Sequence, residues 1–238
     1  MKLTIQKTQE KIEYKVDQVI TLLEALEQIK QTQDSSLAFG SGCRSGICGS
    51  CAVVVDGKEV LACTAKVQEG SVIEPLRNAK VIKDLVVDIE ASLQKNKTAS
   101  AALLTYKETT VTPEDEALYR VQSDCILCNS CYSACPVFSV NDAFLGPFAL
   151  TRVWRYVSDN REEATKEHID AVQQNGIWDC TLCNECTLVC PQGISPKQDI
   201  EKLRAKSAQF GYMDPNFGSF GGGFGNDFGG GFDGSPVF

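Results

Sequence analysis

Twelve cysteines, gathered into three short clusters, constrain this chain more than any other feature of its sequence. They make up about 5% of the residues, below the roughly 8–10% that is typical of small scaffolds built from disulfides. The stretch 1–15 alternates apolar and charged residues and predicts no signal peptide, so we expect reduced thiols. Clustered reduced thiols are typical of metal sites. The single histidine excludes a Rieske centre, which needs two, and a set of Cys2His2 zinc fingers.

The first cluster has the spacing C-x4-C-x2-C, with a fourth cysteine farther along the chain. This spacing is that of plant-type [2Fe-2S] sites, in which four thiolates surround two bridged irons. The loop is rich in glycine (Gly40, Gly42, Gly46 and Gly49), which lets backbone N–H groups approach the cluster sulfides. A structural zinc site and redox-active thiols are the alternatives. The predicted [2Fe-2S] ligands are Cys43, Cys48, Cys51 and Cys63.

The second and third clusters each contain the full run C-x2-C-x2-C-x3-C-P. In proteins with two such runs, the fourth cysteine of each run ligates the cluster of the other run. A zinc site accounts for the first three cysteines of a run but not for the repeated x3-C-P ending. The sequence therefore predicts two [4Fe-4S] clusters, and because metal binding is part of the folding energy, their loss should unfold this region. The predicted ligands are Cys125, Cys128, Cys131 and Cys190 for one cluster, and Cys180, Cys183, Cys186 and Cys135 for the other.

Residues 1–97 predict an α+β domain, a β-grasp ferredoxin-like fold of short strands covered by one helix. Thr21 and Glu24 form a capping-box pattern, and the apolar residues that follow share one face of a helix. Asp56-Gly57 stands between two strand-like runs and is typical of a hairpin turn. The expected strands, from their period-two alternation or β-rich composition, are 2–7, 11–16, 52–55, 58–61 and 71–75.

Residues 98–212 predict an all-α domain of the two-cluster ferredoxin type. Prolines at 113, 147 and 196 mark the first turns of three helices, and Ser195 with Gln198 forms a capping-box pattern. A polar helix is expected over 161–174. Residues 213–238 are rich in glycine and phenylalanine and predict a disordered tail. Docking of its phenylalanines on a partner subunit is the alternative.

Outside the cysteine clusters, no pattern in the sequence predicts a further functional site, and none predicts a site that breaks covalent bonds. The chain has no P-loop and no dinucleotide-binding fingerprint. His168 is expected on the solvated face of a polar helix, and Trp154 and Trp178 are expected in the core or beside a cluster. The net charge of -8 argues against nucleic acid and anionic lipid as partners. No apolar run approaches the ~18–20 residues of a membrane span.

The order of the three cysteine clusters resembles that of the iron–sulfur subunits of fumarate reductase and succinate dehydrogenase. The resemblance covers about residues 1–205 and does not include the tail. It is carried by CRSGICGSCAV (43–53), VIKDLVVD (81–88), CILCNSCYSACPVF (125–138), NGIWDC (175–180) and the run 186–191.

The resemblance implies an electron-transfer subunit of an oxidoreductase complex, of the kind that serves anaerobic respiration or the tricarboxylic acid cycle. Such a subunit links an FAD-containing flavoprotein, where fumarate and succinate interconvert, to a quinone-reactive membrane partner. Its clusters carry single electrons, whereas the flavin exchanges two as a hydride. The [2Fe-2S] domain is expected to dock on the flavoprotein.

Cys183 departs from the common family pattern, in which an apolar residue at this place leaves the third cluster as [3Fe-4S]. The sequence therefore predicts [4Fe-4S] as the third centre, and [3Fe-4S] only if Cys183 is not a ligand. The restored cysteine resembles the methylmenaquinol:fumarate reductase branch, whose membrane-side subunit is a cysteine-rich protein.

Two alternatives remain open at this point. One is an iron–sulfur subunit for another flavoprotein, of the heterodisulfide reductase or thiol:fumarate reductase type. The other is a free-standing multi-cluster ferredoxin. For a complex of the fumarate reductase or succinate dehydrogenase type, we expect a peripheral membrane location on the cytoplasmic side. The periplasmic side is expected instead if a signal-bearing partner exports the folded chain.

Overall fold

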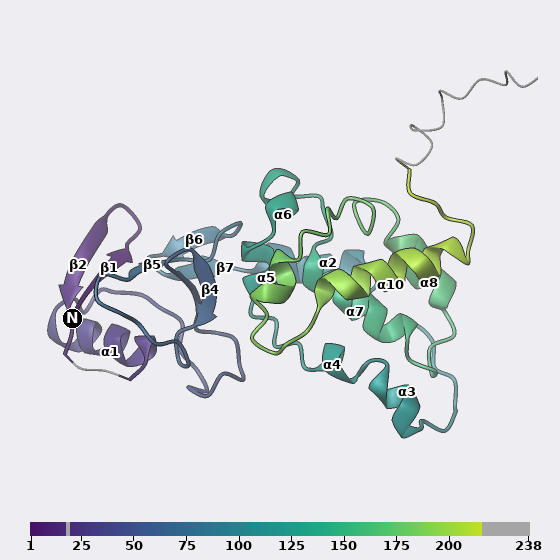
Figure 1. The fold of residues 1–238 in the computed structure, drawn as a ribbon, viewed down its shortest axis with the longest axis horizontal. Helices are drawn as coiled ribbons and strands as arrows, with labels where there is room; N and C mark the ends of the chain where they lie inside the picture. Colours follow the sequence, from purple (N-terminus) through teal and green to yellow (C-terminus); the bar gives the residue numbers. More distant parts are fainter. Residues whose placement is uncertain (18–19, 216–238) are drawn as a thin grey trace, which may run out of the picture.

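The computed structural model describes residues 1–17 and 20–215. A strand-rich N-terminal domain and a helical C-terminal domain lie end to end along the long axis of the molecule (Figure 1). The predicted α+β fold class is confirmed. The prediction for the tail concerns residues that lie mostly outside the described part of the chain.

The N-terminal domain is built on a mixed five-stranded sheet with the strand order β2-β1-β5-β3-β4. β1 pairs parallel with β5, and the remaining pairs are antiparallel. A separate two-stranded ribbon, β6-β7, follows. The elements are β1 (Lys2–Gln6), β2 (Lys11–Lys15), α1 (Leu22–Thr32), β3 (Ala52–Val55), β4 (Lys58–Leu61), β5 (Val72–Glu74), β6 (Lys80–Lys83) and β7 (Val86–Asp88).

Local signals in the sequence account for the helix and for the hairpin of this domain. Thr21 and Glu24 form the predicted capping box, which satisfies two backbone N–H groups at the start of α1. Asp56 and Gly57 both have positive φ, the conformation that matches a two-residue turn to the twist of the β3-β4 hairpin. The apolar face of α1 packs on the sheet, and its buried residues are Leu22, Leu23, Ala25, Leu26 and Ile29.

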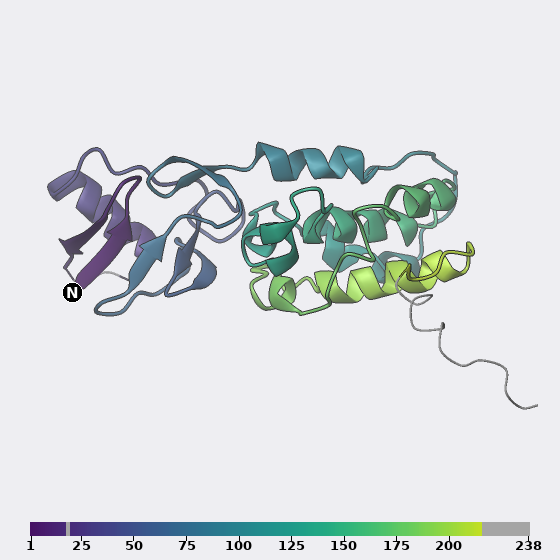
Figure 2. The same cartoon turned by 90° about the horizontal axis from the view of Figure 1, so that it is seen from above.

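The C-terminal domain consists of short helices around two longer ones, α7 and α10. Helix α2 lies along the same domain (Figure 2), and its Leu93 packs against the helical core. The elements are α2 (Glu90–Thr98), α3 (Pro113–Ala117), α4 (Arg120–Ser123), α5 (Ser130–Ser133), α6 (Pro136–Val140), α7 (Pro147–Val157), α8 (Thr165–Ala171), α9 (Glu185–Leu188) and α10 (Pro196–Ala208).

Helices α7 and α10 pack against each other and form the centre of the helical core. Leu150 and Val153 of α7 and Ile200 and Leu203 of α10 are fully buried, as their spacing predicts. Trp154 and Trp178 pack at the edge of this core, which confirms their expected place. No helix among the described residues is long and apolar enough to cross a membrane.

Two helix predictions are wrong in detail. The polar helix expected over 161–174 covers only Thr165–Ala171. Before its start the Glu162 carboxylate accepts the backbone N–H of Ala164 and fixes a turn, and after its end Val172 and Gln173 make turn hydrogen bonds to Ile169 and Asp170. Ser195 stands at the N-cap of α10 without capping it, since its hydroxyl is paired with that of Thr187 at 3.3 Å. In both places a side-chain hydrogen bond that the sequence pattern does not indicate replaces the expected helical or capping arrangement.

Candidate metal centres

The loop that carries the first cysteines directs its backbone N–H groups at sulfur. The N–H groups of Ser45, Ile47 and Cys48 donate to the Cys43 sulfur at 3.3–3.4 Å. These hydrogen bonds stabilise the thiolate and lower the pKa of Cys43 to about 6. Such donors also tune the potential of a cluster bound here.

The β3-β4 hairpin brings the fourth cysteine of the first set beside this loop. Cys63 follows β4, and its sulfur accepts the N–H of Gly46 at 3.2 Å. Cys43 and Cys48 are exposed, whereas Cys51 and Cys63 are buried. Burial raises the pKa of Cys51 to about 11. The first set therefore has an outer pair of thiols at the surface and an inner pair that is buried.

Glycine is required in this loop because other chain segments approach its backbone closely. A Cβ at Gly42 would lie 2.8 Å from the Cys48 sulfur, and one at Gly40 would lie 1.9 Å from the Ser50 carbonyl oxygen. Gly46 and Gly49 have φ of +76° and +73°. A side chain at any of these places would therefore clash with a neighbouring segment or strain the backbone of the loop.

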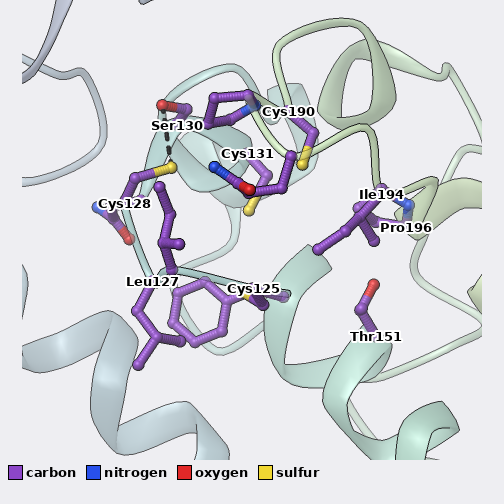
Figure 3. Close-up of a pocket in the computed structure, with 14 residues that line it drawn as sticks. Cys125, Leu127, Cys128, Ser130, Cys131, Thr151, Cys190, Ile194 and Pro196 are labelled. Carbon is purple, nitrogen blue, oxygen red and sulfur yellow. Dashed lines mark hydrogen bonds between the residues drawn. The ribbon is translucent and has the colours of Figure 1, made fainter. Parts of the chain in front are cut away.

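The structure brings the eight remaining cysteines together in two cavities of the helical domain. Each cavity takes three cysteines from one run and the fourth cysteine from the other, which is the crossed arrangement that the motif predicts. One is lined by Cys125, Cys128, Cys131 and Cys190 (Figure 3), and the other by Cys135, Cys180, Cys183 and Cys186.

The two runs fold in the same way locally. Leu127 and Asn129 in one run and Leu182 and Asn184 in the other all have left-handed φ between 53° and 73°. A four-residue helix follows each pair, α5 after the first and α9 after the second. The repeated strained turns wrap each run around its cavity, which is the kind of backbone strain that functional sites retain.

Most thiols around the two cavities are held in a low-dielectric environment. Burial raises the pKa of the thiols of Cys125, Cys128, Cys131, Cys135, Cys180 and Cys186, the last to about 12. Buried thiolates need positive charge beside them, which irons supply. Soft sulfur donors in sets of four suit iron–sulfur clusters. The residues therefore fit such a cofactor.

Polar contacts between the domains place the first cysteine loop next to the first cavity. Asn78 donates from Nδ2 to the carbonyl oxygens of Tyr132 at 2.9 Å and Ser133 at 3.2 Å. Gln192, which lines the first cavity, donates to the Gly46 carbonyl at 3.1 Å. Sequence analysis missed these residues because their partners lie 54 to 146 positions away, and no local pattern indicates them.

His168 is not on a solvated face, so this prediction is wrong. The side chain is fully buried, with Nε2 3.0 Å from the Glu162 carboxylate, and its ring stacks on Tyr156. Burial alone would raise the pKa of Glu162, but hydrogen bonds from His168, Thr105 and nearby backbone N–H groups outweigh it and lower the pKa to about 2. The pair of Glu162 and His168 has a structural role, since it holds the extended segment before α3 against α8.

A ferredoxin-type sheet domain, joined to a helical domain with two four-cysteine cavities, defines a class of multi-cluster electron-transfer proteins. Comparison with known proteins supports this class for both domains. Residues 2–94 match the model of the 2Fe-2S iron–sulfur cluster binding domain, and residues 121–194 match that of the 4Fe-4S dicluster domain. The chain shares its fold with a chain of the Mycobacterium smegmatis Sdh1 complex in the apo form, with a TM-score of 0.76 at 22% identity over 90% of this chain and 98% of that one.

Two relatives narrow the class to one family. The fumarate reductase iron–sulfur subunit of Haemophilus influenzae is 36% identical over 81% of this chain and 84% of its own length. The 8-methylmenaquinol:fumarate reductase iron–sulfur subunit of Wolinella succinogenes is 39% identical over 80% of this chain, and the match spans 65% of that subunit. This chain belongs to the family of fumarate reductase and succinate dehydrogenase iron–sulfur subunits.

Proposed function

We propose that this chain carries single electrons between a flavoprotein that interconverts fumarate and succinate and a quinone-reactive membrane-associated partner. The observation that carries the proposal is the row formed by the three cysteine sets. The first loop adjoins the cavity of Cys125. Helix α5, which carries Cys131 of that cavity, packs against α9, which carries Cys186 of the next. Clusters held in this row would supply one-electron redox chemistry.

The ligands of the proposed clusters are the twelve cysteines in the sets that line the three sites. Cys43, Cys48, Cys51 and Cys63 hold a [2Fe-2S] cluster. Cys183 belongs to the second cavity, which supports a third centre of the [4Fe-4S] type.

The exposed side of the first loop is the proposed face for the FAD-containing flavoprotein. Cys43 and Cys48 are exposed there, and Ile47 between them is 68% exposed. The far end of the row, where Cys183 is exposed, faces a cysteine-rich or membrane-anchor subunit. The flavin exchanges two electrons with substrate, so the row of clusters separates two-electron from one-electron chemistry. The quinone is reached only through this partner, and the complex is peripheral to the membrane.

Affinity purification of the tagged chain from its native host, under anaerobic conditions, tests the proposal. A flavoprotein with covalent or tight FAD should copurify, and the complex should reduce fumarate with a quinol analogue or oxidise succinate with a quinone analogue. Replacement of Cys48 by alanine, which removes the donor atom, should abolish electron transfer to the quinone side while the flavoprotein alone still turns over with an artificial dye. A chain that purifies alone, or a complex without fumarate- or succinate-dependent turnover, would refute the proposal.

A further inference from the structure

The backbone of Gly49 touches Cys128 across the boundary between the two domains. A Cβ added at Gly49 would lie 2.8 Å from the Cys128 Cβ, 3.0 Å from its Cα and 3.0 Å from the Ile126 carbonyl oxygen. The gap between these backbones is thus too small for even a methyl group. Gly49 directly follows Cys48 of the first loop, and Cys128 lines the first cavity.

Packing and hydrogen bonds fix this contact. Ile126 and Cys128 pack against the core of the N-terminal domain although they belong to the helical one. The buried Ser133 hydroxyl donates to Glu59 at 2.7 Å, which ties α5 to β4 beside the contact. The two backbones therefore meet at a rigid place, where neither domain can move without breaking buried interactions.

A second connection between the same two sites is longer. It runs from Cys190 along the chain to Gln192, across the hydrogen bond to the Gly46 carbonyl, and from the Gly46 N–H to the Cys63 sulfur. It contains two hydrogen bonds and several more covalent bonds than the connection through Gly49. Because electron tunnelling weakens with every added bond and gap, the Gly49 route is the stronger of the two.

We propose that the contact between Gly49 and Cys128 is the electron junction between the [2Fe-2S] cluster and the adjacent cubane cluster, and that the missing side chain at position 49 sets the gap. The inference rests on the proposed function in taking both sites as cluster sites. One electron leaves one cluster and arrives at the other, in either direction, and no bond forms or breaks. Gly49 is a positioning residue, since it ligates neither cluster.

The test compares Gly49→Ala with Gly70→Ala in the full chain with its clusters. Gly70 has nearly the same left-handed backbone, with φ of +82° against +73°, but a Cβ there meets nothing within 4 Å. The two variants therefore share the backbone strain and differ in the clash with Cys128. Iron content and the EPR signals of both clusters establish that they are assembled.

In Gly49→Ala, the electron transfer rate between the clusters after photochemical reduction should fall several-fold, and the magnetic coupling between their EPR signals should weaken. Gly70→Ala should match the wild type in both measurements. An unchanged rate and coupling in fully assembled Gly49→Ala would overturn the inference. The measurement uses the chain alone, so its outcome is independent of whether the flavoprotein partner is found.

Gln192→Ala keeps the inference testable if Gly49→Ala fails to assemble its [2Fe-2S] cluster. This variant cuts the longer connection and leaves Gly49 in place. The rate should then stay close to that of the wild type, whereas a several-fold loss would show that the junction runs through Gln192 instead.

Discussion

The hydroxyl of Ser133 donates a hydrogen bond of 2.7 Å to the carboxylate of Glu59, and both side chains are buried although 74 positions separate them. Ser133 also accepts the backbone N–H of Arg77 at 2.9 Å. One serine of α5 thus satisfies two groups of the N-terminal domain. Because a buried polar group without a partner is costly, this arrangement holds the domains in one relative position.

Replacement of Ser133 by alanine should destabilise the protein by about 1–3 kcal/mol, since it leaves a buried carboxylate without its donor. The midpoint of chemical denaturation of the cluster-containing protein measures the effect. Ser139→Ala is the matched control, because its exposed hydroxyl bonds only to the carbonyl of Pro136 in the same helix. Equal midpoints for the two variants would contradict the role given to Ser133.

Replacement of Glu162 by glutamine should cost about 3 kcal/mol at neutral pH. The pKa of Glu162 is lowered from 4.5 to about 2 in the folded protein, and each tenfold change in an acid dissociation constant corresponds to about 1.4 kcal/mol. A lowered pKa contributes stability that is present above pH 4.5 and is lost as the pH falls towards 2. The advantage of the wild type over the variant in unfolding midpoint should therefore shrink as the pH falls from 4.5 towards 2, which denaturation at several pH values checks.

Replacement of Asp199 by asparagine should stabilise the protein at pH 8 by about 1–3 kcal/mol. Burial raises the pKa of this side chain to about 6, against the hydrogen bond that Gln122 donates to it at 2.8 Å. A raised carboxyl pKa means that stability falls as the pH rises from about 4 to 6, and the asparagine variant should lose this dependence. The exposed residue Asp142 provides the control variant Asp142→Asn, whose stability should follow the wild type at every pH.

Replacement of Cys183 by alanine should convert the third centre to a three-iron cluster, because one thiolate of the set is then missing. The wild type should contain roughly ten irons per chain and show no three-iron EPR signal when oxidised. The variant should lose about one iron and gain that signal. A three-iron signal of full intensity in the wild type would mean that Cys183 is not a ligand.

Removal of iron by a chelator under reducing conditions should unfold the helical domain before the N-terminal sheet. The helices that flank the cavities, α5, α6 and α9, have only four or five residues, too few to be stable alone. The sheet has a core of its own in which residues such as Leu3, Ile5 and Leu26 are fully buried. Hydrogen exchange should therefore rise in residues 120–194 first, and simultaneous loss of protection in both domains would contradict this order.

Sequence alone determined the features that depend on residues close together in the chain. The spacing of the cysteines, the capping box at Thr21 and Glu24, and the turn at Asp56 and Gly57 act within a few positions, so they can be read without knowledge of the fold. The motif also predicted which cysteines share a cavity, because in proteins with two C-x2-C-x2-C-x3-C-P runs the fourth cysteine of each run joins the site of the other. Whether those cysteines ligate clusters stays a prediction.

Only the tertiary structure decided the features that depend on distant partners. The buried place of His168 follows from Glu162 and from the segment that this carboxylate anchors, and the hydrogen bond between Ser133 and Glu59 follows from the docking of two domains. The close approach of Gly49 to Cys128 has the same origin. Local propensity fixes what a few neighbouring residues can form, whereas burial and hydrogen bonding between distant segments are settled only when the whole chain has packed.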